Sequence, residues 1–325
     1  RAAGVRGKRP ARSIDMDAMA RLLLLRRAKA ATRSQPSLVI AHSLLGDHRG
    51  YGRLWSQAFS LTDVCALRHR GLAGAHAFAL DFEGAACLAA EHAQALEAAY
   101  VGCPFDLIGA SFGAVLASHV ARAARAAGGC PRRLVLVDPP PSVPTELAVP
   151  KMASSRRTAA MGVLLIHLQI EMGATVWEQL PQLQTLPEEA LPHFVAAQCL
   201  EEGSSRSDLV ASVERFERLL LVYRQCRHAF HTLSASIDAH SDGSSHPAVL
   251  MALSSERWPT FREMFPGIKE DLVDRYGPAA TLRLPGRHIA MIGRCLSNAD
   301  AVFTGTAERF LGDGLVDEWL LTQNV

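Results

Sequence analysis

The sequence lacks several features that would assign a protein to a specialised class. No apolar run approaches the roughly 18 residues of a membrane-spanning helix, and the longest leucine cluster, residues 22–25, is flanked by arginines. No internal repeat is visible, and the formal net charge is only +2. We therefore expect no integral membrane segment and no nucleic-acid partner.

Cysteine is present, but in a pattern that disfavours both disulfides and metal binding. The seven cysteines are odd in number and scattered, and no Cys-x-x-Cys pair occurs among them. A disulfide framework or a zinc site is therefore not expected. We predict buried, unreactive thiols and a reducing compartment, cytoplasmic or organellar, in preference to secretion.

Charge is distributed unevenly along the chain. Residues 1–33 hold ten Lys or Arg against two aspartates, a net charge of +8, which leaves −6 on the remainder. Such a segment is compatible with a transit-peptide remnant, a linker or a docking segment. We predict that residues 1–34 are a basic leader or linker, poorly ordered and solvated, and that residues 35–325 form the folded domain.

The order of the expected elements indicates an α/β fold. Hydrophobic residues make up 49% and charged residues 20% of the 325 positions, a composition that supports a large core. Strands alternating with helices imply parallel pairing through right-handed crossovers. The pattern predicts strands at 37–41, 64–71, 105–111 and 132–138, and helices at 84–100 and 112–129.

The pattern changes after about residue 145. Residues 151–240 have helical stretches and no convincing strand, whereas strands are again expected at 247–253 and 279–286. The segment 301–311 has the pattern of a closing helix. A helical insertion inside a parallel sheet indicates a lid, which we place at about 145–245.

One short motif carries chemistry. Gly109-Ala110-Ser111-Phe112-Gly113 lies between an apolar strand and a helix of small residues. This placement is typical of the nucleophile elbow of α/β-hydrolases, whose sharp turn requires small neighbours and exposes the serine hydroxyl. The helix that follows directs its N–H groups and its partial positive charge toward the reacting carbon. The alternative is an ordinary strand-to-helix connection.

A serine nucleophile needs a base and an acid, which in α/β-hydrolases follow it in the order acid, then histidine. Asp138 ends the strand after the elbow helix, and His288 follows the last expected strand. Glu256, one strand later than Asp138, is the competing acid. The remaining histidines that we considered read as surface, loop or lid residues: His42, His48, His69, His119, His228 and His246.

Backbone N–H groups complete the predicted active site. An oxyanion hole in this arrangement uses the residue after the nucleophile and a residue in the loop after the first long strand. These positions correspond to Phe112 and, in the loop 41–51, to Leu44.

Together these segments resemble the thioesterase domains that end polyketide synthase, nonribosomal peptide synthetase and fatty acid synthase lines. Two positions depart from the family pattern: Ala114 replaces a glycine, and prolines follow Asp138. The segments that carry the resemblance are 42–46 with Tyr51, 66–72, 102–113, 134–138 and 284–288.

The resemblance implies a serine acyl-thioesterase with an α/β-hydrolase fold, a mostly parallel central sheet and a helical lid. Its substrate would arrive on the phosphopantetheine arm of an acyl or peptidyl carrier protein and leave by hydrolysis or cyclisation. No cofactor or metal is implied. A general carboxylesterase or lipase would share the same triad, and a non-catalytic acyl-binding or partner-binding α/β-hydrolase fold is the third hypothesis.

Overall fold

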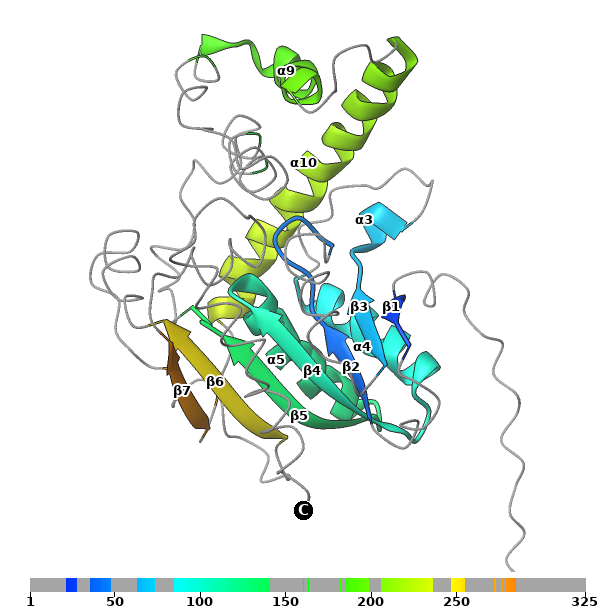
Figure 1. Cartoon of the computed structure of the whole chain (residues 1–325), viewed down its shortest axis with the longest axis vertical. Helices are drawn as coiled ribbons and strands as arrows, with labels where there is room; N and C mark the ends of the chain where they lie inside the picture. Colours follow the sequence, from blue (N-terminus) through cyan, green and yellow to red (C-terminus); the bar gives the residue numbers. More distant parts are fainter. Residues whose placement is uncertain are drawn as a thin grey trace, which may run out of the picture.

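A seven-stranded sheet organises the chain in the computed structural model (Figure 1). Its strands lie in the order β1-β3-β2-β4-β5-β6-β7. The structure describes residues 22–27, 36–47, 63–73, 85–140, 185–198, 206–235, 247–254 and 279–284, with the single positions 160, 163, 182, 272 and 276.

The described strands from β2 to β7 pair in parallel. The central parts of β2 to β6 are largely buried apolar runs, as expected for a sheet covered on both faces. The prediction of an α/β fold with a mostly parallel central sheet is thus confirmed. The strands are β2 (Ser37–Ile40), β3 (Val64–Leu67), β4 (Pro104–Ala110), β5 (Cys130–Val137), β6 (Ala248–Ser254) and β7 (Ala280–Leu284).

The strand β1 (Leu22–Arg26) is antiparallel to β3 at the edge of the sheet. It lies within the segment 1–34, which we expected to be a poorly ordered leader, so residues 22–26 depart from that expectation. Four consecutive leucines form a strand here because β3 offers them a hydrogen-bonding edge. The sequence pattern did not predict this pairing, in which the side chains of Leu23 and Leu24 are exposed.

The prediction of a strand up to Gly71 is wrong at its end. β3 stops at Leu67, and Arg70–Ala73 forms the short helix α3. The chain leaves the sheet because the His69 N–H donates to the Gly46 carbonyl, 2.8 Å away in another loop.

Two helices pack side by side behind the sheet (Figure 1). They are α4 (Ala85–Ala99) and α5 (Phe112–Ala126), and both match predicted helices. Small residues on α5, among them Ala114, Ala117 and Ala121, are buried and allow the helix to approach β4 and β5 closely.

A long helix, α10 (Arg206–Ala235), extends away from the edge at which the parallel strands end (Figure 1). It packs against α3, α4 and α5, and also against α9 (Leu191–Gln198), which follows the short helix η5 (Glu188–Ala190). The helices η5, α9 and α10 fall within residues 151–240, for which helices and no strand were predicted. No described helix is both long enough and apolar enough to cross a membrane.

The expectation of buried thiols holds for only some of the described cysteines. Cys65 and Cys226 are buried, but Cys87, Cys103 and Cys130 are exposed. Cys103 and Cys130 stand where β4 and β5 begin, at the amino edge of the sheet, and Cys87 lies in the first turn of α4. The sequence does not show that these three cysteines lie at the exposed ends of helices and strands instead of in their buried interiors.

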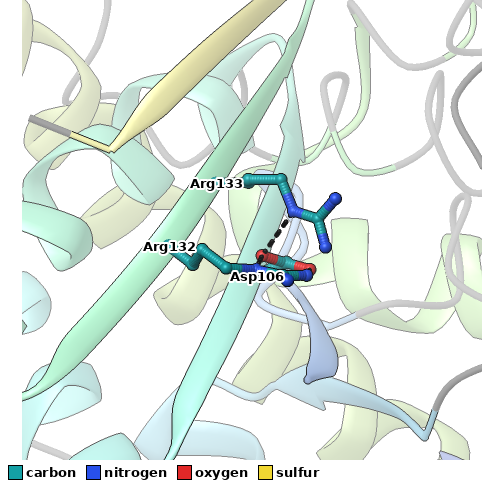
Figure 2. Close-up of polar contacts among 3 residues, drawn as sticks. All are labelled: Asp106, Arg132 and Arg133. Atoms are coloured by element: carbon teal, nitrogen blue, oxygen red, sulfur yellow. Dashed lines mark hydrogen bonds and ion pairs between the residues drawn. The ribbon is translucent and has the colours of Figure 1, made fainter. Parts of the chain in front are cut away.

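An ion-pair cluster ties β4 to β5 at the same edge (Figure 2). Asp106 accepts two hydrogen bonds from Arg132, at 3.1 and 2.8 Å, and one from Arg133 Nε at 3.1 Å. Successive strand residues ordinarily point to opposite faces. Here a bulge on β5 breaks that rule, since Phe105 pairs with Pro131 but Asp106 pairs with Arg133. The bulge allows both guanidinium groups to contact one carboxylate.

We expect Asp106→Ala to destabilise the fold by about 3–5 kcal/mol, because it leaves the Arg133 guanidinium buried without its carboxylate. Arg132→Ala should cost less, since the Arg132 side chain is 29% exposed while that of Arg133 is 6% exposed. Urea unfolding of both variants measures the two free energies. The double variant Asp106→Leu/Arg133→Met should recover much of the loss. An equal or larger loss in Arg132→Ala would contradict this ranking.

Candidate active site

Ser111 occupies a strained turn between β4 and α5. Its backbone has φ 51° and ψ −118°, a conformation that residues other than glycine rarely adopt. The turn is tight: a Cβ built on Gly109 would overlap the carbonyl group of Gly113 and lie 2.8 Å from Ala114 N. Gly109 is therefore required by close approach of the backbone, as the motif predicts. Strain of this kind is common at nucleophile elbows.

The turn is joined to the end of β5. The Ser111 N–H donates to the Val137 carbonyl at 2.9 Å, and Ala110 pairs with Val137 in the sheet register. Ser111 and Asp138 are the next residues on these two neighbouring strands. Parallel pairing thus brings two of the predicted catalytic residues to the same edge of the sheet.

Asp138 is fully buried and held by β6. Its N–H donates to the Ala252 carbonyl at 2.7 Å. Its carboxylate accepts hydrogen bonds from the backbone N–H of Ser254 at 3.0 Å and from the Ser254 hydroxyl at 2.8 Å. Like Ser111, Asp138 has a positive φ, here 44°. The sequence analysis did not identify Ser254 as a partner of Asp138. The sequence offers one indication of this contact, which is that Ser254 ends the strand next to β5.

The loop after β2 is closed by its own hydrogen bonds. The Ser43 N–H donates to the Asp47 carbonyl, the Leu45 N–H to Ser43 Oγ and the Gly46 N–H to the Ser43 carbonyl, at 3.2, 3.2 and 2.9 Å. Among the hydrogen bonds of the described residues, none uses the N–H of Leu44. The predicted oxyanion donor of this loop is therefore the N–H that the turn leaves available.

Phe112 is the corresponding position on the elbow side. It begins α5, so its N–H lies in the first turn, where no preceding helical carbonyl can accept it. The first described hydrogen bonds to the Ser111 carbonyl come from Ala114 and Val115, at 3.0 and 3.4 Å. A helix N-terminus directly after the serine favours negative charge at this point.

Three buried histidines lie around the loop, and this corrects part of the sequence interpretation. His42 and His69 were read as surface or loop residues, but both are fully buried, as is His92 on α4. The His42 ring contacts the rings of His69, His92 and Phe112, with centroids 5.9, 5.0 and 5.9 Å apart. Burial lowers the pKa of His42 to about 4, so its ring is neutral at neutral pH.

His119, also read as a surface or lid residue, is buried on α5. Its Nε2 lies 3.1 Å from the Leu233 carbonyl in the last turn of α10, and Arg122 donates to its Nδ1 at 2.9 Å. The ring thus caps α10, which is a structural role. Phe230 of the same helix contacts Phe112, with ring centroids 6.3 Å apart.

His288 and the competing acid Glu256 lie outside the described residues, as do His48 and His246. β7 ends at Leu284, so the chain leaves the sheet four residues before His288 at the edge where Ser111 and Asp138 lie. Among the described residues, no three His, Cys, Asp or Glu side chains are arranged to hold a metal ion.

The family profile of the thioesterase domain matches residues 36–259, more than half of the chain. The chain belongs to the thioesterase domain family. The profile covers the elbow, Asp138 and the loop after β2. No curated protein matches the sequence.

Solved structures of similar fold support the architecture of this thioesterase domain. The Vlm2 thioesterase domain bound with a dodecadepsipeptide matches with a TM-score of 0.54 and 13% identity, covering 90% of this chain and 98% of that one. The SrfTE thioesterase domain, described for cyclisation of surfactin, has a TM-score of 0.52 and 14% identity over 95% and 100%. AB3403, a four-domain nonribosomal peptide synthetase, has a TM-score of 0.50 and 17% identity over 89% and 20%. At these identities the similarity establishes the fold alone.

The thioesterase domain should lose stability in mild acid partly through His42. The pKa of this group falls from 6.5 to about 4 on folding. The contribution of neutral His42 to the free energy of unfolding is therefore fully present above pH 6.5 and is lost as the pH falls toward 4. Between pH 7 and pH 5 this amounts to about 2 kcal/mol. Urea unfolding should show a shallower loss over this interval for His42→Gln than for the unsubstituted protein. Equal losses would mean that His42 does not titrate in this way.

Proposed function

We propose that the protein is a serine acyl-thioesterase that releases an acyl, polyketide or peptidyl chain from a phosphopantetheine carrier protein. Ser111 is the nucleophile, His288 the general base and Asp138 the acid of the triad. The N–H groups of Leu44 and Phe112 form the oxyanion hole. Family membership supports the thioester chemistry, and the residue roles are our proposal.

One observation carries the proposal. Ser111 is held at φ 51° between a buried strand and the N-terminus of α5, and its own N–H donates to Val137, the residue before Asp138. A serine that serves only as a connection would have no reason to occupy a strained conformation. The strain is explained if the turn must present the hydroxyl next to two unused N–H donors.

Acylation then follows from the arrangement. His288 removes the Ser111 proton while Asp138 orients the imidazole and stabilises its positive charge. The Ser111 oxygen attacks the thioester carbonyl, and the negative charge that develops on the carbonyl oxygen is stabilised by the N–H groups of Leu44 and Phe112. Each such donor is typically worth about 10²–10³ in rate. The C–S bond breaks, the imidazolium protonates the leaving thiolate, and an acyl-serine ester remains.

Release repeats the sequence with a second nucleophile. Water, or a hydroxyl or amine within the acyl chain, gives a proton to His288 and attacks the ester, and Ser111 leaves with the proton returned. Water yields a free acid and an internal nucleophile yields a ring. We propose that the helical segment containing α9 and α10 covers the acyl chain as a lid. The contact of Phe230 with Phe112 supports this, because it joins α10 directly to the residue after the nucleophile.

The nucleophile is tested by intact-protein mass spectrometry after incubation with a series of acyl-pantetheine thioesters. We expect a mass gain of one acyl group, or released acid, with the unsubstituted protein. Ser111→Ala should lose this activity, on the order of 10⁶-fold in turnover, with its unfolding curve preserved. Ser118→Ala, a serine within the helix that follows Ser111, is the matched control and should retain activity.

Two results would reject the proposed function. Cleavage of oxygen esters without any reaction of thioesters would indicate a general carboxylesterase. Reaction with neither class, in a folded protein, would indicate a domain that only binds.

The identity of the acid is tested by two amide substitutions. Asp138→Asn should lower kcat by on the order of 10³–10⁴ because the imidazole loses its orienting carboxylate. Glu256→Gln should change kcat little. The opposite ranking would move the acid of the triad to Glu256, two residues past the end of β6.

A further inference from the structure

A buried hydrogen bond joins the loop after β2 to helix α4. His42 Nε2 and His92 Nε2 lie 3.0 Å apart, and neither ring is exposed to solvent. His42 lies in the loop that carries Leu44, whereas His92 lies fifty residues away in the sequence. Because both rings are buried, this contact supplies a hydrogen bond that solvent cannot supply.

The partners of His42 determine where its proton lies. His42 Nδ1 is 2.8 Å from the Ser43 carbonyl oxygen, which can only accept, so Nδ1 carries the hydrogen. A neutral ring then has a bare Nε2, and the proton in the 3.0 Å contact belongs to His92 Nε2. His92 therefore donates to His42 and selects its tautomer.

This tautomer holds one particular peptide group. In a trans peptide the carbonyl and the N–H point in opposite directions. The carbonyl of Ser43 and the N–H of Leu44 belong to the same peptide unit. When His42 Nδ1–H and Gly46 N–H both donate to the Ser43 carbonyl, the Leu44 N–H is directed to the opposite side.

The surroundings keep the His42 ring neutral and fixed. His69 contacts it from the β3–α3 connection, His92 from α4 and Phe112 from α5, while Asp47 is the nearby acid on its own loop. Desolvation outweighs the attraction of Asp47, and the pKa of His42 is lowered. The ring is thus clamped between the elbow helix and two other elements.

We propose that His92 is a positioning residue for the oxyanion hole, acting through His42 to orient the peptide between Ser43 and Leu44. The inference rests on the proposed function, because it requires the Leu44 N–H to be an oxyanion donor. It extends that function to a helix that carries none of the proposed catalytic groups.

The expected effect is smaller than the loss of a donor. Without His92 the turn retains the hydrogen bonds of the Ser43, Leu45 and Gly46 N–H groups. The loop therefore persists, and the peptide between Ser43 and Leu44 loses only the restraint that the fixed His42 imidazole supplies. Removing an oxyanion donor typically costs about 10²–10³ in kcat. We therefore expect His92→Phe to lower kcat by about 10- to 100-fold, with KM within about twofold.

The test compares His92→Phe with His92→Gln, whose side-chain amide can donate from nearly the position of the imidazole Nε2. His92→Gln should restore kcat to within about threefold. His119→Phe is the matched control, since this buried histidine bonds to α10 rather than to the loop. It should lower the melting temperature while kcat is largely retained. Two rates are measured: turnover of an acyl-pantetheine thioester, and labelling of Ser111 by a fluorophosphonate, followed by intact mass.

The two rates distinguish a failure of the proposed role of His92 from a failure of the proposed thioesterase function. If Ser111 is labelled but no thioester is cleaved, the proposed substrate class fails, and the order of labelling rates still decides the role of His92. If Ser111 is not labelled in the unsubstituted protein, both fail. Equal losses in His92→Phe and His92→Gln, a parallel rise in KM, or the same loss of kcat in His119→Phe would overturn the inference.

A spectroscopic measurement needs no folded His92 variant. Nitrogen-15 spectra of the imidazoles, assigned with His42→Gln, should show His42 protonated at Nδ1 and bare at Nε2 near neutral pH. The opposite tautomer would overturn the proposal, since the Ser43 carbonyl would then lack its imidazole donor.

Discussion

The close approach of β4 to the first turn of α5 is the constraint on which the candidate site depends. A side chain at position 109 would overlap the backbone of Gly113, so the chain can turn within one residue only if Gly109 has none. The residue in the turn is Ser111, and its backbone conformation costs of order 1–3 kcal/mol. The buried contacts of β4 and α5 with the rest of the core offset this cost, since Phe105, Leu107 and Val115 are almost completely enclosed.

The two strands beside β4 position the remaining parts of the candidate site. β2 lies on one side and leads into the loop of Leu44, while β5 lies on the other and ends directly before Asp138. Because all three strands are parallel, their carboxyl ends open at one edge. Hydrogen bonds from neighbouring side chains hold both parts: the Ser254 hydroxyl donates to the Asp138 carboxylate, and the His42 imidazole contacts the Ser43 carbonyl before Leu44. The site is therefore supported by backbone pairing first and by buried polar side chains second.

The sequence predicted those parts whose requirements are local. The glycines around Ser111 are needed by a turn five residues long, and apolar runs such as residues 132–138 allow few alternatives to a buried strand. Asp138 was chosen as the candidate acid because it directly follows such a run. The burial of His42 and His92 could not be predicted in this way, since it arises only when α4 packs against the loop after β2. Ser254 and the strand β1 likewise depend on pairing between segments far apart in the sequence.

The bulge on β5 has a consequence at the far end of the strand. Before it, Phe105 pairs with Pro131; with unbroken pairing from there, Ser111 would stand level with Val137. The extra residue advances the strand by one, so that Asp138 stands level with Ser111 instead. Side chains alternate along a strand, so a change of one residue would also reverse the face that each presents. Within the pair β4–β5, the count of residues near Asp106 thus determines which side chain accompanies the serine at the opposite edge. A single-residue deletion there would act on the candidate site through strand alignment, without changing any of the candidate catalytic residues.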